Sequence, residues 1–95
     1  MTSLEWVQKL LNILCALFGR WGQSCANLPG DPADRSKAVN AYYRDNGPPH
    51  VAERAETLEQ LDKLELHLAD AANPLDAEIR QLLASFIADV RADCE

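Results

Sequence analysis

Apolar residues recur three or four positions apart in four stretches of the chain, a spacing that indicates helices. Each stretch is bounded by residues that start or stop a helix. Thr2-Ser3-Leu4-Glu5 has the capping-box pattern, and Asp31-Pro32 and Asn73-Pro74 each place a capping side chain before a proline. Asn46-Gly47 suits a helix end. The pattern predicts helices over about residues 3–21, 32–45, 49–72 and 74–93, with Thr57 as an alternative start for the third.

No stretch sustains the strict alternation of apolar and polar residues that a half-buried strand requires, and β-branched residues are few. Short connections between successive helices favour antiparallel neighbours. The chain has 95 residues, enough for one hydrophobic core and too few for two. We therefore predict a single all-α domain over residues 1–95, built as an irregular four-helix bundle.

The first predicted helix carries more apolar surface than one core contact needs. One seam, with steps of four, three and four residues, consists of Val7, Leu11, Leu14 and Phe18. A second seam with the same steps lies beside it and consists of Trp6, Leu10, Ile13 and Leu17. Together the two seams cover about twice the arc of an ordinary core-facing stripe. A helix of this kind must be covered on two sides.

Two arrangements satisfy that requirement: the helix is central to the bundle, or one seam meets another polypeptide. We favour the second, in the form of a homodimer, because large unmatched apolar patches are uncommon on monomers. Aromatic residues are also enriched in interface cores. The predicted contact residues are Trp6, Leu10, Ile13 and Leu17, with Trp21 as a second aromatic anchor. In the alternative, both tryptophans cap the ends of a monomeric core.

Two further surfaces are candidates for partner binding. Tyr42 and Tyr43 lie together on the second helix, and one of them is expected to dock that helix on the bundle while the other stays free. On the third helix, Leu66 points away from the core into a row of acidic residues. Glu65 falls inside the apolar arc of the same helix, so we expect it to pair with an arginine or to lie at the solvent edge.

The charge balance limits the kinds of partner. Fifteen acidic and nine basic residues give a net charge of −6, which argues against direct nucleic-acid binding. Residues 1–30 hold only one of the acidic residues, so the acidic excess belongs to the remainder of the chain. A basic, partly apolar protein is the partner that this distribution favours.

The three cysteines, Cys15, Cys25 and Cys94, do not form a C-x-x-C spacing and cannot all pair within one chain, so a reducing compartment is the simpler interpretation. Cys25 and Cys94 lie in exposed contexts, where oxidation between chains is an open alternative. Cys15 lies in the core face of its helix, where we expect an unpaired packing residue. Leu10–Phe18 is too short to span a bilayer, and the residues before it carry Glu5 beside Lys9, so they lack the net positive charge of a secretory signal. These observations predict a cytoplasmic protein without stable membrane insertion.

No motif with a recognisable chemistry is present. His67 lies three residues before Asp70, but further zinc ligands are missing, and we expect a solvated histidine. A set of carboxylates wraps around the third helix at intervals of three residues and consists of Glu53, Glu56, Glu59 and Asp62. Such a run is typical of a solvated face. We predict no enzymatic activity, no metal and no cofactor.

These features together suggest a small acidic regulator that inhibits or sequesters a partner protein by steric occlusion, as anti-activators, antitoxins and immunity proteins do. This interpretation rests on size, charge and the lack of catalytic groups. Two alternatives stay open. One is an acidic inhibitor that mimics nucleic acid towards a DNA- or RNA-binding protein. The other is a peripheral membrane protein held by its first helix.

Overall fold

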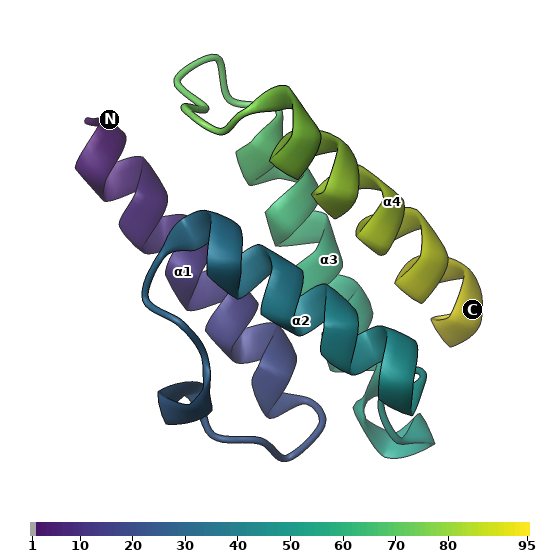
Figure 1. The fold of residues 1–95 in the computed structure, drawn as a ribbon. Coiled ribbons are helices and arrows are strands. Elements are labelled where there is room, and N and C mark those ends of the chain that lie inside the picture. Colours follow the sequence, from purple (N-terminus) through teal and green to yellow (C-terminus); the bar gives the residue numbers. More distant parts are fainter. Residues whose placement is uncertain (1) are drawn as a thin grey trace.

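The computed structural model describes residues 2–95 and contains four α-helices. They are α1 (Ser3–Gly19), α2 (Pro32–Asn46), α3 (Arg54–Leu68) and α4 (Ala77–Cys94), as Figure 1 shows. Two short 3-10 turns, η1 (Cys25–Asn27) and η2 (Val51–Glu53), precede α2 and α3. No strand occurs in the described part of the chain. The predicted all-α class and the four-helix architecture are confirmed.

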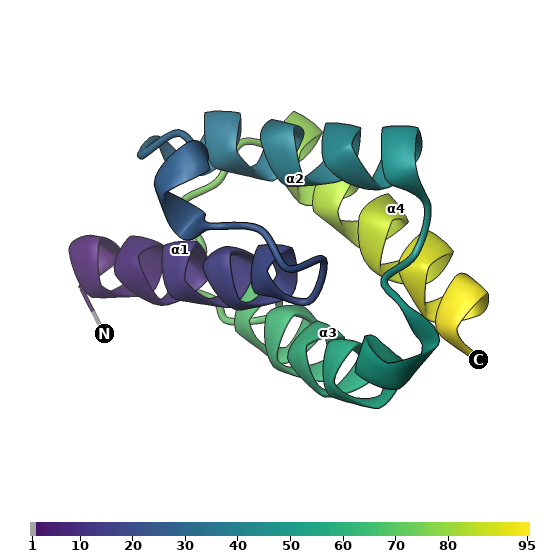
Figure 2. The same ribbon diagram turned by 90° about the horizontal axis from the view of Figure 1, so that it is seen from below.

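The helices surround one core, and each has two main neighbours. α1 packs between α2 and α3, and α4 packs against the same two helices from the opposite side. Figures 1 and 2 show this arrangement from two directions. No helix in residues 2–95 has the length and apolar character needed to cross a membrane.

The predicted starts of α1 and α2 are confirmed by their capping contacts. The Thr2 hydroxyl accepts a hydrogen bond from the backbone N–H of Glu5 at 3.2 Å. The Asp31 carboxylate accepts one from the N–H of Asp34 at 3.0 Å, so both side chains satisfy donors that the first helical turn leaves free. At the end of α2, Gly47 adopts a φ of 73°, a conformation that favours glycine.

The third helix is shorter than the predicted span of 49–72. It begins at Arg54 because His50 caps the separate turn η2, accepting a hydrogen bond from the N–H of Ala52 at 3.3 Å. Its other end lies at Leu68, whose carbonyl accepts a hydrogen bond from the Asn73 side-chain amide at 3.1 Å. The chain therefore leaves the helix several residues before Asn73.

The other two boundary errors have similar local causes. α4 begins at Ala77 rather than at residue 74, because the Asn73 side-chain oxygen accepts from the N–H of Leu75 and forms a turn instead of a cap. α1 ends at Gly19 rather than at residue 21. The N–H groups of Arg20 and Trp21 bond carbonyls three residues back, which tightens the last turn.

Neighbouring helices cover one seam of α1 completely and the other in part. The Phe18 ring meets the Tyr42 ring of α2 edge to face at 5.0 Å, and the Trp6 ring lies on His67 of α3. The second seam, which was predicted to meet a partner, is 0–6% exposed and consists of Trp6, Leu10, Ile13 and Leu17. The predicted contact of this seam with a partner was therefore wrong, because the seam lies in the core. In the first seam Val7 and Leu11 are half-buried, so α1 keeps a limited apolar surface.

A reciprocal contact between Trp6 and His67 joins α1 to α3. The two rings stack at 4.2 Å with an interplanar angle of 18°. The Trp6 indole N–H donates to the His67 carbonyl at 3.2 Å, and His67 Nε2 lies 2.8 Å from the Trp6 carbonyl. Because a carbonyl oxygen only accepts, Nε2 carries the hydrogen. The prediction of a solvated His67 was wrong, since the residue is 5% exposed.

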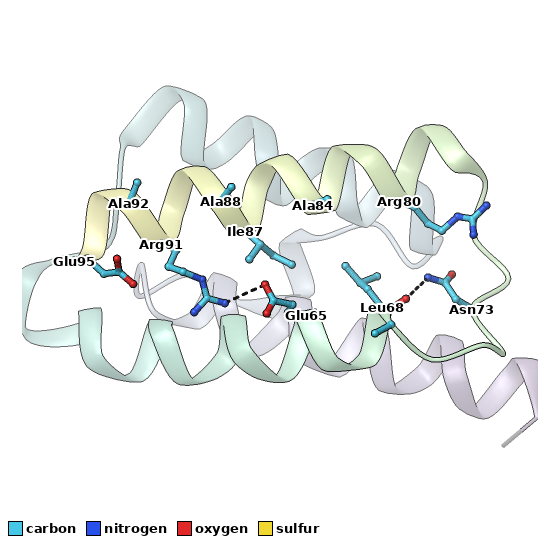
Figure 3. Close-up of a pocket in the computed structure, with 11 residues that line it drawn as sticks. Glu65, Leu68, Asn73, Arg80, Ala84, Ile87, Ala88, Arg91, Ala92 and Glu95 are labelled. Atoms are coloured by element: carbon cyan, nitrogen blue, oxygen red, sulfur yellow. Dashed lines mark hydrogen bonds and ion pairs between the residues drawn. The ribbon is translucent and has the colours of Figure 1, made fainter.

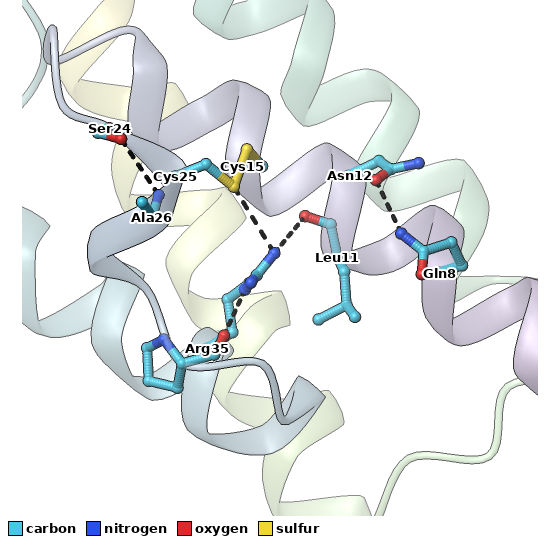
Figure 4. The surroundings of a disulfide bond; sticks show 9 residues. Gln8, Leu11, Asn12, Cys15, Ser24, Cys25, Ala26 and Arg35 are labelled. Atoms are coloured by element: carbon cyan, nitrogen blue, oxygen red, sulfur yellow. Dashed lines mark hydrogen bonds between the residues drawn. A yellow bond between two sulfur atoms is a disulfide. The ribbon is translucent and has the colours of Figure 1, made fainter.

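A disulfide ties the segment between α1 and α2 to the bundle (Figure 4). Cys15 of α1 and Cys25 of η1 form the bond, with their Cα atoms 5.2 Å apart. Arg35 of α2 lies beside it and donates to the Pro29 carbonyl at 2.6 Å and to the Leu11 carbonyl at 3.2 Å. The expectation that Cys15 is an unpaired packing residue was wrong, and a bond between Cys15 and Cys25 was not predicted.

Candidate functional site

The residues predicted to form an interface are divided between the core and the surface. Trp6, Leu10, Ile13 and Leu17 are buried against α3 and the core, as described above, and offer no surface to a partner. Trp21 is half-buried, and its indole N–H donates to the Gly47 carbonyl at 3.0 Å. The alternative in which the two tryptophans cap the ends of a monomeric core therefore matches their positions.

The tyrosines of α2 differ in their surroundings. Tyr42 is half-buried, with its ring edge to face with those of Phe18 and Trp21. Tyr43 is 7% exposed, packs edge to face on Phe86, and donates a hydrogen bond to the Asp93 carboxylate. Both tyrosines thus dock α2 on the bundle, and neither is the free contact residue that the sequence suggested.

The Tyr43 hydroxyl makes the fold sensitive to alkaline pH. Burial, the hydrogen bond to Asp93 and the charges of Asp93 and Asp89 raise its pKa from 10.0 to about 12. An unfolded tyrosine loses its proton near pH 10, whereas the folded state retains it up to about pH 12. The unfolded state then binds fewer protons, so we expect the free energy of unfolding to fall as pH rises through this window.

Urea unfolding across an alkaline pH series tests this prediction. Tyr43→Phe has no phenolic proton, so its free energy of unfolding is expected to fall less than that of wild type between about pH 10 and 12. The control variant Tyr42→Phe is expected to show the same fall as wild type. An identical alkaline decline in wild type and Tyr43→Phe would contradict the assigned cause.

An open apolar groove of about 600 Å³ runs along α3 and α4 (Figure 3). Leu68 of α3 and Ile87 of α4 contribute its larger apolar side chains. Small residues that are exposed to solvent line α4 at intervals of one turn, and they are Ala84, Ala88 and Ala92. Side chains of this size leave the backbone of α4 close to the surface, so another helix can approach it closely.

Charged residues mark the middle and the two ends of this groove. Arg91 of α4 reaches α3, with Nη1 2.7 Å from Asp62 Oδ1 and Nη2 3.5 Å from Glu65 Oε2. The hydrogen bond to Asp62 raises the pKa of Arg91 and fixes its charge. Glu65 thus lies exposed and paired with an arginine, as predicted. Arg80 and Glu95 stand at opposite ends of the groove in Figure 3.

Arg80 and Glu95 differ from the other charges of this face in having no partner. Among residues 2–95 neither side chain takes part in an ion pair or a hydrogen bond. They are separated by about 22 Å along the helix axis, at 1.5 Å of rise per residue. The groove therefore ends in a cation and an anion that form no ion pair or hydrogen bond, about four turns of helix apart. The charge of Glu95 nevertheless contributes to the raised pKa of Arg91.

A second hollow, of about 730 Å³, lies between α1 and α3. It is lined by Lys9 of α1, by Lys63 and Leu66 of α3, and by Asp70 in the turn that follows α3. Leu66 is 77% exposed, which confirms that it points away from the core. The hollow beside it combines the two lysines with Asp70, so charges of both signs surround Leu66.

Metal-binding and nucleophilic side chains are the other candidates for chemistry in residues 2–95. In residues 2–95 no group of three or more His, Cys, Asp or Glu side chains is arranged to hold a metal ion. Cys94 is the free thiol of the described cysteines, and burial raises its pKa, which disfavours the reactive thiolate. The buried His67 is occupied by its bond to the Trp6 carbonyl.

Comparisons with protein-family models, curated proteins and solved structures find no match to this chain. The groove between α3 and α4 is therefore the structural feature that supports a proposal for its function. The sequence did not predict this groove, because α4 has a complete core-facing stripe and its opposite side carries the small and charged residues that are common on a solvent-facing helix surface. The available signal was the recurrence of alanine at positions 84, 88 and 92.

Proposed function

We propose that the protein binds a helix of another protein in the groove between α3 and α4 and acts by covering that helix, without catalysing a reaction. Such an activity is that of a regulator that inhibits or sequesters its partner, in the manner of an anti-activator, an antitoxin or an immunity protein. The observation that carries the proposal is an open apolar groove with exposed alanines and an unpaired charge at each end.

The groove defines the chemistry of the helix that fits it. Small or medium apolar side chains at intervals of one turn suit the alanine-lined wall, since they allow the two helix axes to come close. An acidic residue near Arg80 and a basic residue near Glu95, about four turns apart, complete the match. The charges set orientation and speed of encounter, while apolar burial supplies the affinity.

Selection of helical peptides from a displayed library on the immobilised protein tests this function. We expect the enriched peptides to share the small apolar stripe, with an acidic and a basic residue at opposite ends. An Ala88→Arg bait fills the middle of the groove and is expected to lose them. Ala41→Arg, an exposed alanine on α2, is the matched control and should retain them. Equal enrichment on both baits would refute the groove as the binding surface.

A cytoplasmic location is part of the same proposal, but the structure removes one of the two observations that favoured it. It depended on unpaired cysteines, and the Cys15–Cys25 disulfide is of a kind that persists in oxidising compartments. Its remaining support is that the residues before the short apolar stretch of α1 carry Glu5 beside Lys9 and so have no net positive side-chain charge.

A further inference from the structure

We infer that α4 of a second copy occupies the groove when no other partner is bound, which makes the free protein an antiparallel homodimer. The inference rests on the proposed function in one respect, namely that the groove accepts a helix. It places the contact between copies on α4, on the opposite side of the molecule from α1. Self-association and partner binding then exclude each other, because both use the same surface.

α4 itself carries the small exposed side chains that suit a helix bound in this groove. Ala84, Ala88 and Ala92 are exposed on one face, so two α4 helices can approach with their backbones close together. A two-fold axis near Ala88 brings Ala84 of each copy opposite Ala92 of the other. This is an isologous contact, in which one patch meets itself and the assembly closes at two subunits.

The free charges decide the direction of the second helix. In the antiparallel arrangement Arg80 of each copy lies beside Glu95 of the other, so both unpaired groups gain a partner of opposite sign. A parallel arrangement would instead place Arg80 beside Arg80 and Glu95 beside Glu95, which is repulsive at both ends. The charges at the two ends of the groove thus match those of an antiparallel α4 from a second copy.

Three other surfaces of residues 2–95 are candidate contacts for a second copy, and each lacks the groove's combination of small exposed side chains and oppositely charged ends. One seam of α1, formed by Trp6, Leu10, Ile13 and Leu17, is buried. In the other seam Leu14 and Phe18 are buried, while Val7 and Leu11 are half-buried. On the side of α4 that faces α2, Arg44 is already paired with Asp89, with 2.6 Å between the charged atoms. The hollow between α1 and α3 has Lys9 and Lys63 among its lining residues, without the row of small exposed side chains that close helix packing favours.

Sedimentation equilibrium of the full chain measures the association directly. We expect wild type to be a dimer at micromolar concentration, Ala88→Arg to be a monomer, and the matched control Ala41→Arg to remain a dimer. Circular dichroism establishes that the variants are folded, which is expected because both alanines are exposed.

Charge reversal identifies the orientation. Arg80→Glu and Glu95→Arg are each expected to weaken dimerisation roughly tenfold, because each replaces two exposed ion pairs by two repulsive contacts. The double variant Arg80→Glu/Glu95→Arg restores opposite charges and is expected to recover the wild-type dissociation constant. Failure of the double variant to recover would overturn the antiparallel arrangement.

The outcomes also separate this inference from the proposed function. A wild type that stays monomeric, or a dimer that Ala88→Arg leaves intact, overturns the α4 interface while peptide selection on the groove can still succeed. A dimer with the expected variant behaviour, on a groove that selects no peptide, supports the α4 interface and removes the proposed function.

Discussion

Trp6→Ala is expected to lower the free energy of unfolding by about 3–5 kcal/mol, the range for truncating a large buried aromatic side chain. Trp6 is 0% exposed and stacks on His67. Its removal leaves a cavity between α1 and α3 and deprives the His67 carbonyl of its donor. Urea unfolding followed by circular dichroism measures this loss.

The second tryptophan provides the comparison. Trp21→Phe keeps an aromatic ring beside Tyr42 and removes chiefly the hydrogen bond to the Gly47 carbonyl, so a loss of about 1 kcal/mol is expected. If Trp6→Ala were no more destabilising than Trp21→Phe, Trp6 would not be the buried contact between α1 and α3.

Removal of the Cys15–Cys25 disulfide is expected to cost about 3 kcal/mol of stability, from the chain entropy that a short closed loop removes from the unfolded state. The two cysteines are separated by ten positions in the sequence. The double variant Cys15→Ser/Cys25→Ser should show this loss in urea unfolding. A dithiol reductant should lower the stability of wild type by a similar amount and leave the double variant unchanged.

Cys94→Ser is the matched control, because Cys94 forms no disulfide and is only half-buried. It should keep the wild-type response to the reductant. A wild type whose stability is the same with and without the dithiol would mean that the disulfide is absent from the folded protein.

The features that depend on neighbouring residues were predictable from the sequence. Thr2 and Asp31 each cap a helix through an N–H three residues ahead, so the starts of α1 and α2 follow from local chemistry. Asn73 also caps backbone groups, but it closes a turn between α3 and α4 rather than starting a helix. Asparagine serves both roles, and the local sequence does not separate them.

The role of α1 depended on tertiary structure. Two adjacent apolar seams fit a central helix and an interface helix equally well, and the decision lies with residues far along the chain. His67 of α3 and Tyr42 of α2 are the ones that cover Trp6 and Phe18. The sequence marks His67 as polar, and only the reciprocal contact with Trp6 explains why it is buried.

The candidate site was the least predictable part. Alanine is common on the exposed side of helices, so Ala84, Ala88 and Ala92 carry little information until α3 is placed beside α4. The free charges at the groove ends were equally hidden, because ion pairing depends on the tertiary neighbours of each residue. Arg91 is paired by α3, whereas Arg80 on the same helix is not.

Carbene footprinting at protein concentrations above and below the dimer dissociation constant measures most directly which apolar surface of this chain is exposed to solvent. We expect Leu10 and Leu17 of α1 to stay unlabelled at every concentration, and Ala84, Ala88 and Ala92 of α4 to become labelled on dilution. If dilution instead exposed α1 and left the labelling of α4 unchanged, the first helix would be the true interface.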